Sequence, residues 1–428
     1  MRVDSRELKR GIAVAVPACA LGLAVIADES LGVHIALLGC LYAATVLVMR
    51  HFGLNEKNLH SLFLLTVAIR FGIVIFLHYS QIYPFGGARD DWFYHRVAVS
   101  IAERFRQGDI SLAGLGVFHW YPVFLGGLYT VTLPEMLVGK ATVVWLAGIS
   151  AILLYSITRE MGGSGKWAFA VGFLGCNFYP SYVFYGSLLR KDTLVIPLAL
   201  SGILIIARLV ACFRWRTFFL FMVVSGLLMA LRIYAGFVLA LAFFLSWLAA
   251  SWRPRPGKTI VYGLVMVLVW GCAAHFLGYG FLGIRATRKL LDPEFISHFR
   301  ESQYSIGGSA AQVESDFSSP QAFAGYYSRS FVNVLLGPLP WQIRETRHLF
   351  SLIEVIPWYF CVFLILRGAT RASVLKASAP ALIYGIGLIG CIALFSDNLG
   401  ANTGLRMSSF LALVCLAPFG FGRSTDVG

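Results

Sequence analysis

The stretch TLVIPLALSGILIIARLVAC, residues 193–212, contains one charged side chain, Arg208, in an otherwise apolar run. A helix needs about 20 mostly apolar residues to cross the hydrocarbon core of a bilayer. This stretch has that length and composition, so we predict a membrane-spanning helix. Similar runs recur along the whole chain and determine the fold class.

The other candidate spans have the same apolar character. They are residues 11–28, 33–49, 60–79, 137–158, 167–185, 217–233, 235–252, 259–280, 351–367, 377–396 and 405–422. Residues 121–133 form a shorter apolar run that we expect to dip into the outer leaflet without crossing. The basic, then apolar N-terminus is followed at once by a second apolar run, so we expect an uncleaved first span and not a signal peptide. The sequence predicts an all-α fold, a polytopic transmembrane bundle of about 11–13 spans.

Composition supports this fold class. Hydrophobic residues make up 58% of the chain and charged residues 13%, whereas a soluble domain is roughly 25% charged. The net charge of +14 could suggest nucleic acid, but the basic residues are scattered between apolar runs and form no basic face. The eight cysteines lie in or beside apolar runs without a C-x-x-C pair. We therefore predict no nucleic-acid partner, no disulfide framework and no cysteine metal site.

The basic residues orient the bundle. With the N-terminus in the cytoplasm, alternation of the spans places a basic set inside: Arg50, Lys57, Arg159, Lys166, Arg214, Arg216, Arg253, Arg255, Lys258, Arg367, Arg371, Lys376 and Arg423. This satisfies the positive-inside rule. The two long polar connections, residues 80–120 and 281–350, then face outward. We predict one domain, residues 1–428, in a bacterial inner (plasma) membrane, with its site on the periplasmic or extracellular side.

The first outer loop contains ARDDWFYHRVAVSIAERF, residues 88–105, in a chain that has few acids. Tyr94, Val97, Ile101 and Phe105 recur at helical spacing, which predicts a short amphipathic helix in the membrane interface. Two interpretations of the acids are open. Asp90 could be an N-cap and Asp91 a first-turn acid. Alternatively, a carboxylate at headgroup height is a general base that takes a proton from an acceptor hydroxyl while a lipid-linked sugar phosphate leaves.

The pattern D-x-x-x-Y-H-x-x-A, formed by Asp90, Tyr94, His95 and Ala98, resembles the first outer loop of the GT-C superfamily. These are polytopic membrane glycosyltransferases that use polyprenyl-phosphate-linked sugar donors. The resemblance implies that Asp90 is the catalytic base and Asp91 its supporting neighbour. Tyr94 and His95 would then lie on the substrate side.

Later segments extend this loose resemblance through most of the chain. They are HWYPVFLGGLY (119–129), NFYPSYVFYGSLLRKDTL (177–194), GPLPWQ (337–342) and NTGLRMSSFLALVCLAP (402–418). We expect no large C-terminal soluble domain of the kind found in better-known members, which is a departure from them. The chain also carries Lys191-Asp192 where several relatives have Arg-Glu-like pairs. These departures leave the donor sugar and the acceptor open.

Several cations are candidates for binding the donor phosphate. Arg190 or Lys191 would bind it with Asp192 in a positioning role, or else Asp192 caps a helix while the bases reach the headgroups. Arg232 is a lone charge between two spans, which favours either function or an interfacial pair with lipid phosphate. Arg406 could clamp a phosphate with two hydrogen bonds, or else belong to a capping cluster with Asp397.

The second outer loop is polar and rich in Gly and Ser, and we expect partly helical pieces that cover the substrate cavity. Trp341 is a substrate-side candidate, although an interface anchor is the more common role. His119 could assist proton transfer, and Glu354 could be a buried acid that faces the cavity. Asp90 and Asp91 with a third carboxylate could hold Mg²⁺ or Mn²⁺, but no dense acidic cluster supports a metal site.

Three functions remain open. The first is a glycosyltransferase that moves a sugar from a polyprenyl-phosphate donor to a glycan, lipid or protein of the cell envelope. The second is a polymerase or ligase of polyprenyl-pyrophosphate-linked oligosaccharides, which would depend on Arg and His more than on Asp. The third is a transporter of lipid-linked glycans, which predicts charges within spans and internal pseudo-symmetry.

Overall fold

The computed structural model describes residues 28–51, 56–83, 88–115, 120–251, 292–304, 316–342, 346–396 and 398–422. The expected spans at 11–28 and 259–280 lie outside this part of the chain, apart from Asp28. The described elements are α2 (Glu29–His51), α3 (Lys57–Ser80), α4 (Ala88–Arg106), α5 (Tyr121–Val131), α6 (Met136–Glu160), α7 (Gly165–Asn177), α8 (Pro180–Tyr185), α9 (Asp192–Ala211), α10 (Trp215–Leu231), α11 (Ile233–Ser251), α14 (Pro293–Tyr304), α15 (Pro320–Leu336), η1 (Pro340–Gln342), α16 (Thr346–Ala369), α17 (Ala372–Phe395), α18 (Leu399–Leu405), α19 (Met407–Val414) and η2 (Ala417–Phe421). The all-α prediction is confirmed for the described residues.

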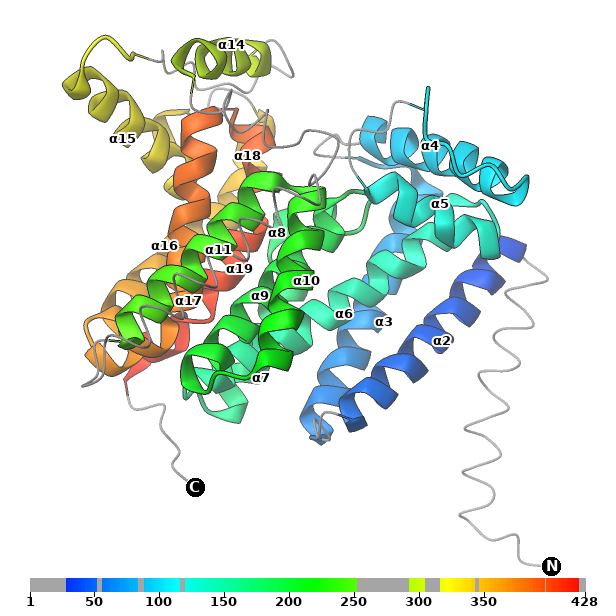
Figure 1. The fold of residues 1–428 in the computed structure, drawn as a ribbon, viewed down its shortest axis with the longest axis horizontal. Helices are drawn as coiled ribbons and strands as arrows, with labels where there is room; N and C mark the ends of the chain where they lie inside the picture. The colour runs from blue at the N-terminus through cyan, green and yellow to red at the C-terminus, as the bar shows by residue number, and fades with distance from the viewer. Residues whose placement is uncertain are drawn as a thin grey trace, which may run out of the picture.

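The long helices lie side by side, and Figure 1 shows α4, α5, α14, α15 and α18 together at one end of them, here called the loop end. Within the described residues, seven helices are long and apolar enough to cross a membrane: α2, α3, α6, α9, α11, α16 and α17. Helices α18 and α19–η2, bent by 54° at Arg406, form an eighth if the bent pair is one span. This arrangement fits an integral, multi-pass membrane protein.

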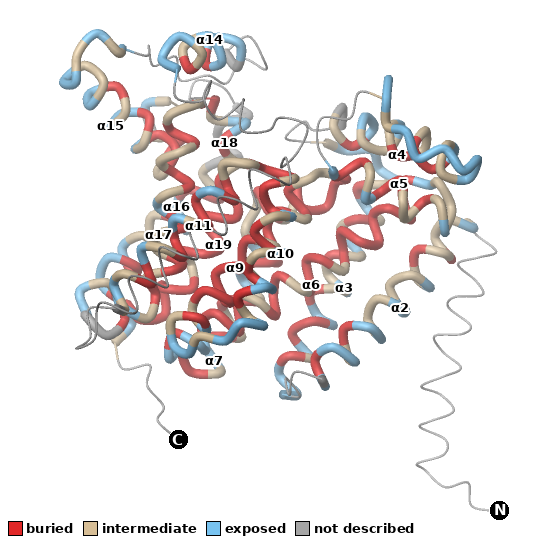
Figure 2. Tube along the Cα trace, viewed as in Figure 1, coloured by how far each residue is buried: buried red, intermediate tan, exposed pale blue. Residues whose placement is uncertain are grey.

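Helix α6 is the most buried of the candidate spans, and Figure 2 shows it buried along most of its length. It packs against α2, α3, α7 and α9. Two glycines allow this close packing. A Cβ at Gly148 would lie 2.7 Å from the Phe63 ring of α3, and one at Gly172 of α7 would lie 2.7 Å from the Ala151 carbonyl of α6. Small residues at such crossings let membrane helices approach closely.

Two expected spans differ from the prediction. Residues 167–185 do not form one helix, because the chain breaks at Phe178 and Tyr179 and restarts as α8 with Pro180 in its first turn. Proline has no N–H for a preceding carbonyl, so it suits a helix start and not an interior. Helix α10 has 17 residues and is shorter than the other candidate spans.

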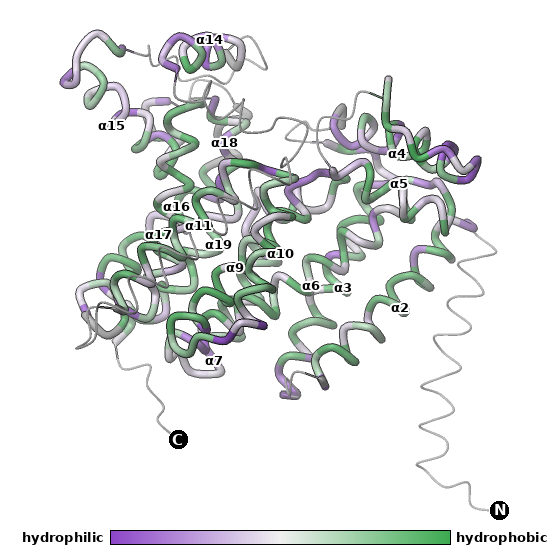
Figure 3. Tube along the Cα trace, viewed as in Figure 1, coloured by the Kyte–Doolittle hydropathy of each residue, from purple (hydrophilic) through white to green (hydrophobic). Residues whose placement is uncertain are grey.

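The expected helix of the first loop is present as α4, which buries Ala98, Ile101 and Ala102 against the rest of the molecule; its position in a membrane interface stays a prediction. Hydropathy alternates around α4, whereas the spans are apolar along most of their length (Figure 3). A Cβ at Gly126 of α5 would lie 2.6 Å from Ile101, so the two loop-end helices are tightly packed.

Two arginines at the end of α4, Arg104 and Arg106, have structural partners. Arg106 donates to the carbonyls of Tyr129, Thr130 and Thr132 at the end of α5. A cation there satisfies carbonyls that have no partner within the helix. Arg104 donates to the carbonyls of Ser111 and Ala113 in the turn that follows α4. Both therefore organise the loop without a substrate.

Candidate functional site

The two adjacent aspartates of α4 have different surroundings. The side chain of Asp91 is fully buried, and its Oδ2 lies 2.9 Å from Nζ of Lys140, which is equally buried in α6. Its Oδ1 accepts a hydrogen bond of 2.7 Å from the N–H of Leu189. Asp91 thus joins α4 to α6 and to the segment before α9. This carboxylate is an internal partner and not a solvent-facing group.

Lys140 was missed by the sequence analysis. It lies four residues inside an apolar span, and an ionisable residue within a span usually has a specific partner or function. That signal pointed to Lys140, but the sequence did not show that its partner lies in the first loop. A buried charge left without its partner is costly, so the pair fixes how α4 sits on the bundle.

Asp90 is half-exposed, with 49% of its side chain accessible, and its Oδ2 lies 3.3 Å from a terminal nitrogen of Arg190. Helix α4 begins at Ala88, so both acids lie in its first turn and Asp90 is not an N-cap residue. Because α4 is anchored through Asp91, the next carboxylate is held near Arg190 while it remains accessible.

Arg190 belongs to a series of linked ion pairs. Its Nε lies 3.7 Å from Asp192, and the other oxygen of Asp192 lies 2.5 Å from Arg232. Asp192 and Arg232 are both buried. Asp192 is the first residue of α9 and follows the N-cap residue Lys191, so it is a first-turn acid and not the N-cap. Arg232, at the end of α10, is bound by a protein carboxylate where the sequence suggested a substrate or lipid phosphate.

Lys191 is the cation of this group without an ion pair of its own in the described part of the chain. Burial lowers the pKa of its amine to about 8, and the nearby Arg232 contributes in the same direction. We call Asp90, Arg190, Lys191, Asp192 and Arg232 the charge cluster. Three cations against two carboxylates leave it one positive charge in excess when all five are ionised, which favours an anionic ligand.

Tyr94 and His95 lie on two sides of α4. The Tyr94 ring contacts the Tyr121 ring at 5.3 Å between centroids. Burial raises the pKa of its hydroxyl, and so does the charge of Asp90, which places Tyr94 on the side of the charge cluster. Nδ1 of His95 lies 3.0 Å from the Tyr129 hydroxyl, and burial lowers its pKa below the ordinary 6.5. His95 is thus a neutral hydrogen-bonding group near pH 7.

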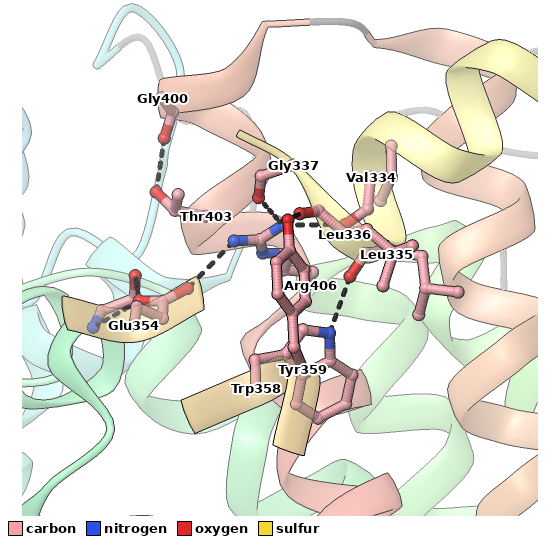
Figure 4. Close-up of polar contacts among 11 residues, drawn as sticks. Val334, Leu335, Leu336, Gly337, Glu354, Trp358, Tyr359, Gly400, Thr403 and Arg406 are labelled. Carbon is pink, nitrogen blue, oxygen red and sulfur yellow. Dashed lines mark hydrogen bonds and ion pairs between the residues drawn. The ribbon is translucent and has the colours of Figure 1, made fainter. Parts of the chain in front are cut away.

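Arg406 is buried and lies in a separate polar centre, drawn in Figure 4. One nitrogen donates to the carbonyls of Val334 and Gly337, each at 2.8 Å, and another lies 3.0 Å from Glu354. Trp358 and Tyr359 donate to the next two carbonyls, Leu335 and Leu336. Four carbonyls at the end of α15 therefore have side-chain partners, as a buried helix end requires. These contacts favour the capping alternative for Arg406, with Glu354 as its acidic partner; Asp397 lies outside the described residues.

Trp341 and Glu354 are the remaining candidates within the described residues. Trp341, in η1, is 74% exposed, as an interface anchor would be. Glu354 is buried as expected, and its carboxylate accepts hydrogen bonds from Ser181 and Arg406. His119 lies outside the described residues. The described residues contain no group of three or more His, Cys, Asp or Glu side chains that could hold a metal ion.

Comparison of the chain with models of protein families and with curated protein sequences finds no match. Any assignment of function therefore depends on the residues and their geometry.

Proposed function

We propose that this protein is a membrane glycosyltransferase. It transfers a sugar from a polyprenyl-phosphate-linked donor to a glycan, lipid or protein of the cell envelope. The observation that carries the proposal is the charge cluster, where the half-exposed Asp90 lies beside Arg190 at the loop end of an apolar bundle. A lipid-linked anionic donor and a polar acceptor can meet at such a boundary.

In this reaction each charged group has a role. The acceptor hydroxyl attacks the anomeric carbon of the donor sugar, and its proton passes to the Asp90 carboxylate. The bond between that carbon and the phosphate oxygen breaks, so polyprenyl phosphate leaves with an additional negative charge. Arg190 and Lys191 are the cations suited to this charge. Arg232 acts through Asp192, and Asp91 acts by positioning α4.

The proposal includes a topology. The chain crosses a bacterial inner membrane about 11–13 times, with its N-terminus in the cytoplasm. Both long loops lie on the outer side, and α4 and α14–α15 lie in the membrane interface there. Basic residues at the opposite connections support this orientation. Trp341 anchors the second loop at that surface.

The decisive experiment assays purified full-length protein with a lipid-linked sugar donor. Asp90→Asn should reduce kcat by about 10²–10⁴-fold, as expected for loss of a general base, with the protein still folded. Glu103→Gln is the matched control, because Glu103 is an exposed acid on the same helix. Full activity in a folded Asp90→Asn protein would refute the assignment of the base.

A polymerase or ligase acting on polyprenyl pyrophosphate is the second candidate. The excess of cations over acids in the charge cluster favours it, since a pyrophosphate needs more positive charge than a monophosphate. The same assay separates the two functions. A loss in Arg190→Gln that exceeds the loss in Asp90→Asn would favour the second candidate.

A further inference from the structure

Arg70 is a buried cation in the interior of α3, and the proposed reaction does not use it. Helix α3 is a candidate span, and only 1% of Arg70 is accessible to solvent. An ionisable residue inside a span is costly and usually has a specific partner or function. The partners of the Arg70 guanidinium therefore indicate its role.

The hydrogen-bond partners of Arg70 in the described part of the chain lie in one short segment. One terminal nitrogen donates to the carbonyl of Val183 at 2.6 Å and to the Ser187 hydroxyl at 3.1 Å, and the other donates to the carbonyl of Tyr182 at 2.8 Å. The guanidinium carbon also lies 4.5 Å from the centre of the Tyr182 ring. A planar guanidinium can bind several acceptors at once, which an ammonium group cannot do as well. Arg70 thus joins α3 to the end of α8 and to the turn after it.

Helix α8 depends on such contacts because it has only six residues. An isolated helix of that length is not stable by itself. At its other end, the carboxylate of Glu354 in α16 accepts hydrogen bonds from the N–H and the hydroxyl of Ser181. An acid at the start of α8 and a cation at its end both suit the helix dipole. Side chains of α16 and α3 therefore fix α8 between them.

The segment after α8 leads directly into the charge cluster. Residues 186–191 connect α8 to α9 and lie in neither helix. They include two cations of the cluster, Arg190 and Lys191. Tyr185 ends α8, and the centre of its ring lies 4.7 Å from the guanidinium carbon of Arg190. The position of α8 therefore affects the position of Arg190 through a direct contact as well as through the chain.

This connection is held at two points by other helices. Arg70 of α3 binds its second residue, Ser187, and Asp91 of α4 accepts from the N–H of Leu189. Backbone outside a helix has few hydrogen bonds of its own, and within an apolar bundle it needs such partners. Asp91 bonds one N–H near the end of the connection, so it does not fix the start. Arg70 supplies the contacts there.

We propose that Arg70 is a positioning residue for the proposed reaction. It holds the end of α8 and the start of residues 186–191, and it thereby keeps Arg190 beside Asp90, where the leaving phosphate is bound. Arg70 is buried and acts only through these contacts, so it touches neither donor nor acceptor. This inference rests on the proposed function, because Arg190 has a chemical role in that reaction.

Arg300 in α14 offers a matched control. It is equally buried, with 1% accessible, and it donates to the carbonyls of Ala393 and Leu394 at the end of α17 and to the Ser330 hydroxyl. Its guanidinium carbon lies 4.8 Å from the centre of the Tyr326 ring. The two arginines thus make the same kinds of contact, but those of Arg300 join α14 and α15 to α17 and involve no member of the charge cluster. Substitution of either arginine by Met should therefore lower the thermal unfolding midpoint to a similar extent.

A double-variant cycle separates positioning from stability. Arg70→Met should reduce kcat/KM for a lipid-linked sugar donor by about 10–100-fold in folded full-length protein, since a displacement of about 1 Å at a reaction site can cost that much. In an Arg190→Gln background the same change should reduce it by at most about twofold more, because the group that Arg70 positions is already lost. Arg300→Met should act independently, with the same factor in both backgrounds. Equal factors for Arg70→Met in the two backgrounds would overturn the proposal.

The conservative change Arg70→Lys gives a second measure. Lysine keeps the charge but not the planar arrangement of donors, so it should restore the unfolding midpoint more fully than kcat/KM. Arg70→Lys also takes the place of Arg70→Met in the cycle if Arg70→Met does not fold. Complete recovery of kcat/KM would show that the charge alone matters, which contradicts positioning through the α8 carbonyls.

The titration of Lys191 tests the positioning without any assay of activity. Competitive labelling of amines in the full-length protein should give a pKa of about 8 in wild type, where Lys191 is buried. Arg70→Met should raise this pKa toward the ordinary 10.5, because a displaced connection lets water reach the amine. Arg300→Met should leave it unchanged. The charge cluster has the same residues in all three proteins.

The outcomes separate this inference from the proposed function. A raised Lys191 pKa in Arg70→Met, in a protein whose wild type transfers no sugar, would support the role of Arg70 in holding residues 186–191 and contradict the glycosyltransferase. Sugar transfer by wild type together with an unchanged Lys191 pKa in folded Arg70→Met would contradict the positioning role alone.

Discussion

Asp90 and Asp91 are adjacent in the first turn of α4, but they have different neighbours. Asp91 is fully buried between Lys140 of α6 and the N–H of Leu189, while Asp90 is half-exposed beside Arg190. Consecutive helical residues point about 100° apart around the axis, since a turn takes 3.6 residues. One helix can therefore present one acid to the protein interior and the next to a reaction site.

This difference agrees with a structural role for Asp91 and with the proposed chemical role of Asp90. Asp91 has internal partners and no access to solvent. Asp90 has one partner on one side and open space on another, as a base must have. Asp91 holds the helix that carries Asp90, so damage to either residue would reduce activity. Stability measurements distinguish the two causes.

The largest effect is expected from breaking the buried pair. Lys140→Met should lower the free energy of unfolding by about 3–5 kcal/mol, because it leaves the Asp91 carboxylate buried without its counter-charge. The double variant Lys140→Met with Asp91→Asn should recover much of this loss, since Asn keeps an acceptor for the Leu189 N–H. Thermal unfolding in detergent measures both. An additive loss in the double variant would show that the pair is not coupled.

A smaller effect is expected at the buried pair inside the charge cluster. Asp192→Asn leaves the Arg232 guanidinium without its carboxylate and should cost roughly 3 kcal/mol of stability. It should also raise KM for the donor, because Arg190 loses one of its two acidic partners. The conservative Asp192→Glu should restore part of the stability. A stability equal to wild type in Asp192→Asn would argue that the two side chains do not pair in the membrane.

The third prediction concerns pH. In the proposed reaction Lys191 binds phosphate in its charged form, and its pKa of about 8 means that this form is lost as pH rises through 8. Above that pH, kcat/KM should fall about tenfold per pH unit, since it follows the ionisation of the free enzyme. Lys191→Arg should keep its charge and move the fall to higher pH. An identical profile in both proteins would exclude Lys191 as the group responsible.

The smallest effect on stability is expected at Asp90. Its ion pair with Arg190 is accessible to solvent, and exposed pairs contribute about 0–1 kcal/mol. Asp90→Asn should therefore change the unfolding midpoint little while it abolishes most activity. An unfolding loss as large as that of Lys140→Met would mean that the two aspartates share one structural role.

Most spans could be predicted from the sequence because membrane insertion depends on local apolar length. The amphipathic helix α4 could also be predicted from the sequence, since its pattern lies within one helix. The break at Phe178 was not predicted from apolar character alone. Pro180, in its first turn after the break, was the local signal that could have shown it.

The candidate site could be predicted from the sequence only in part. The sequence identified Asp90, Arg190, Lys191, Asp192 and Arg232 one by one, and the fold brings them into one cluster. Lys140 was missed because its partner lies in another element. The sequence left Arg406 open between a phosphate clamp and a capping cluster, and the contacts with the end of α15 and with Glu354 favour the second.

The sequence by itself determined an all-helical membrane bundle with an acidic amphipathic helix outside the spans, because apolar length and helical periodicity are local properties. It could not determine which aspartate is buried. That choice depends on Lys140 and on the Leu189 N–H, which is 98 residues from Asp91 along the chain. Only packing brings such distant groups within hydrogen-bonding distance. The tertiary structure thereby buries Asp91 and leaves Asp90 accessible to solvent.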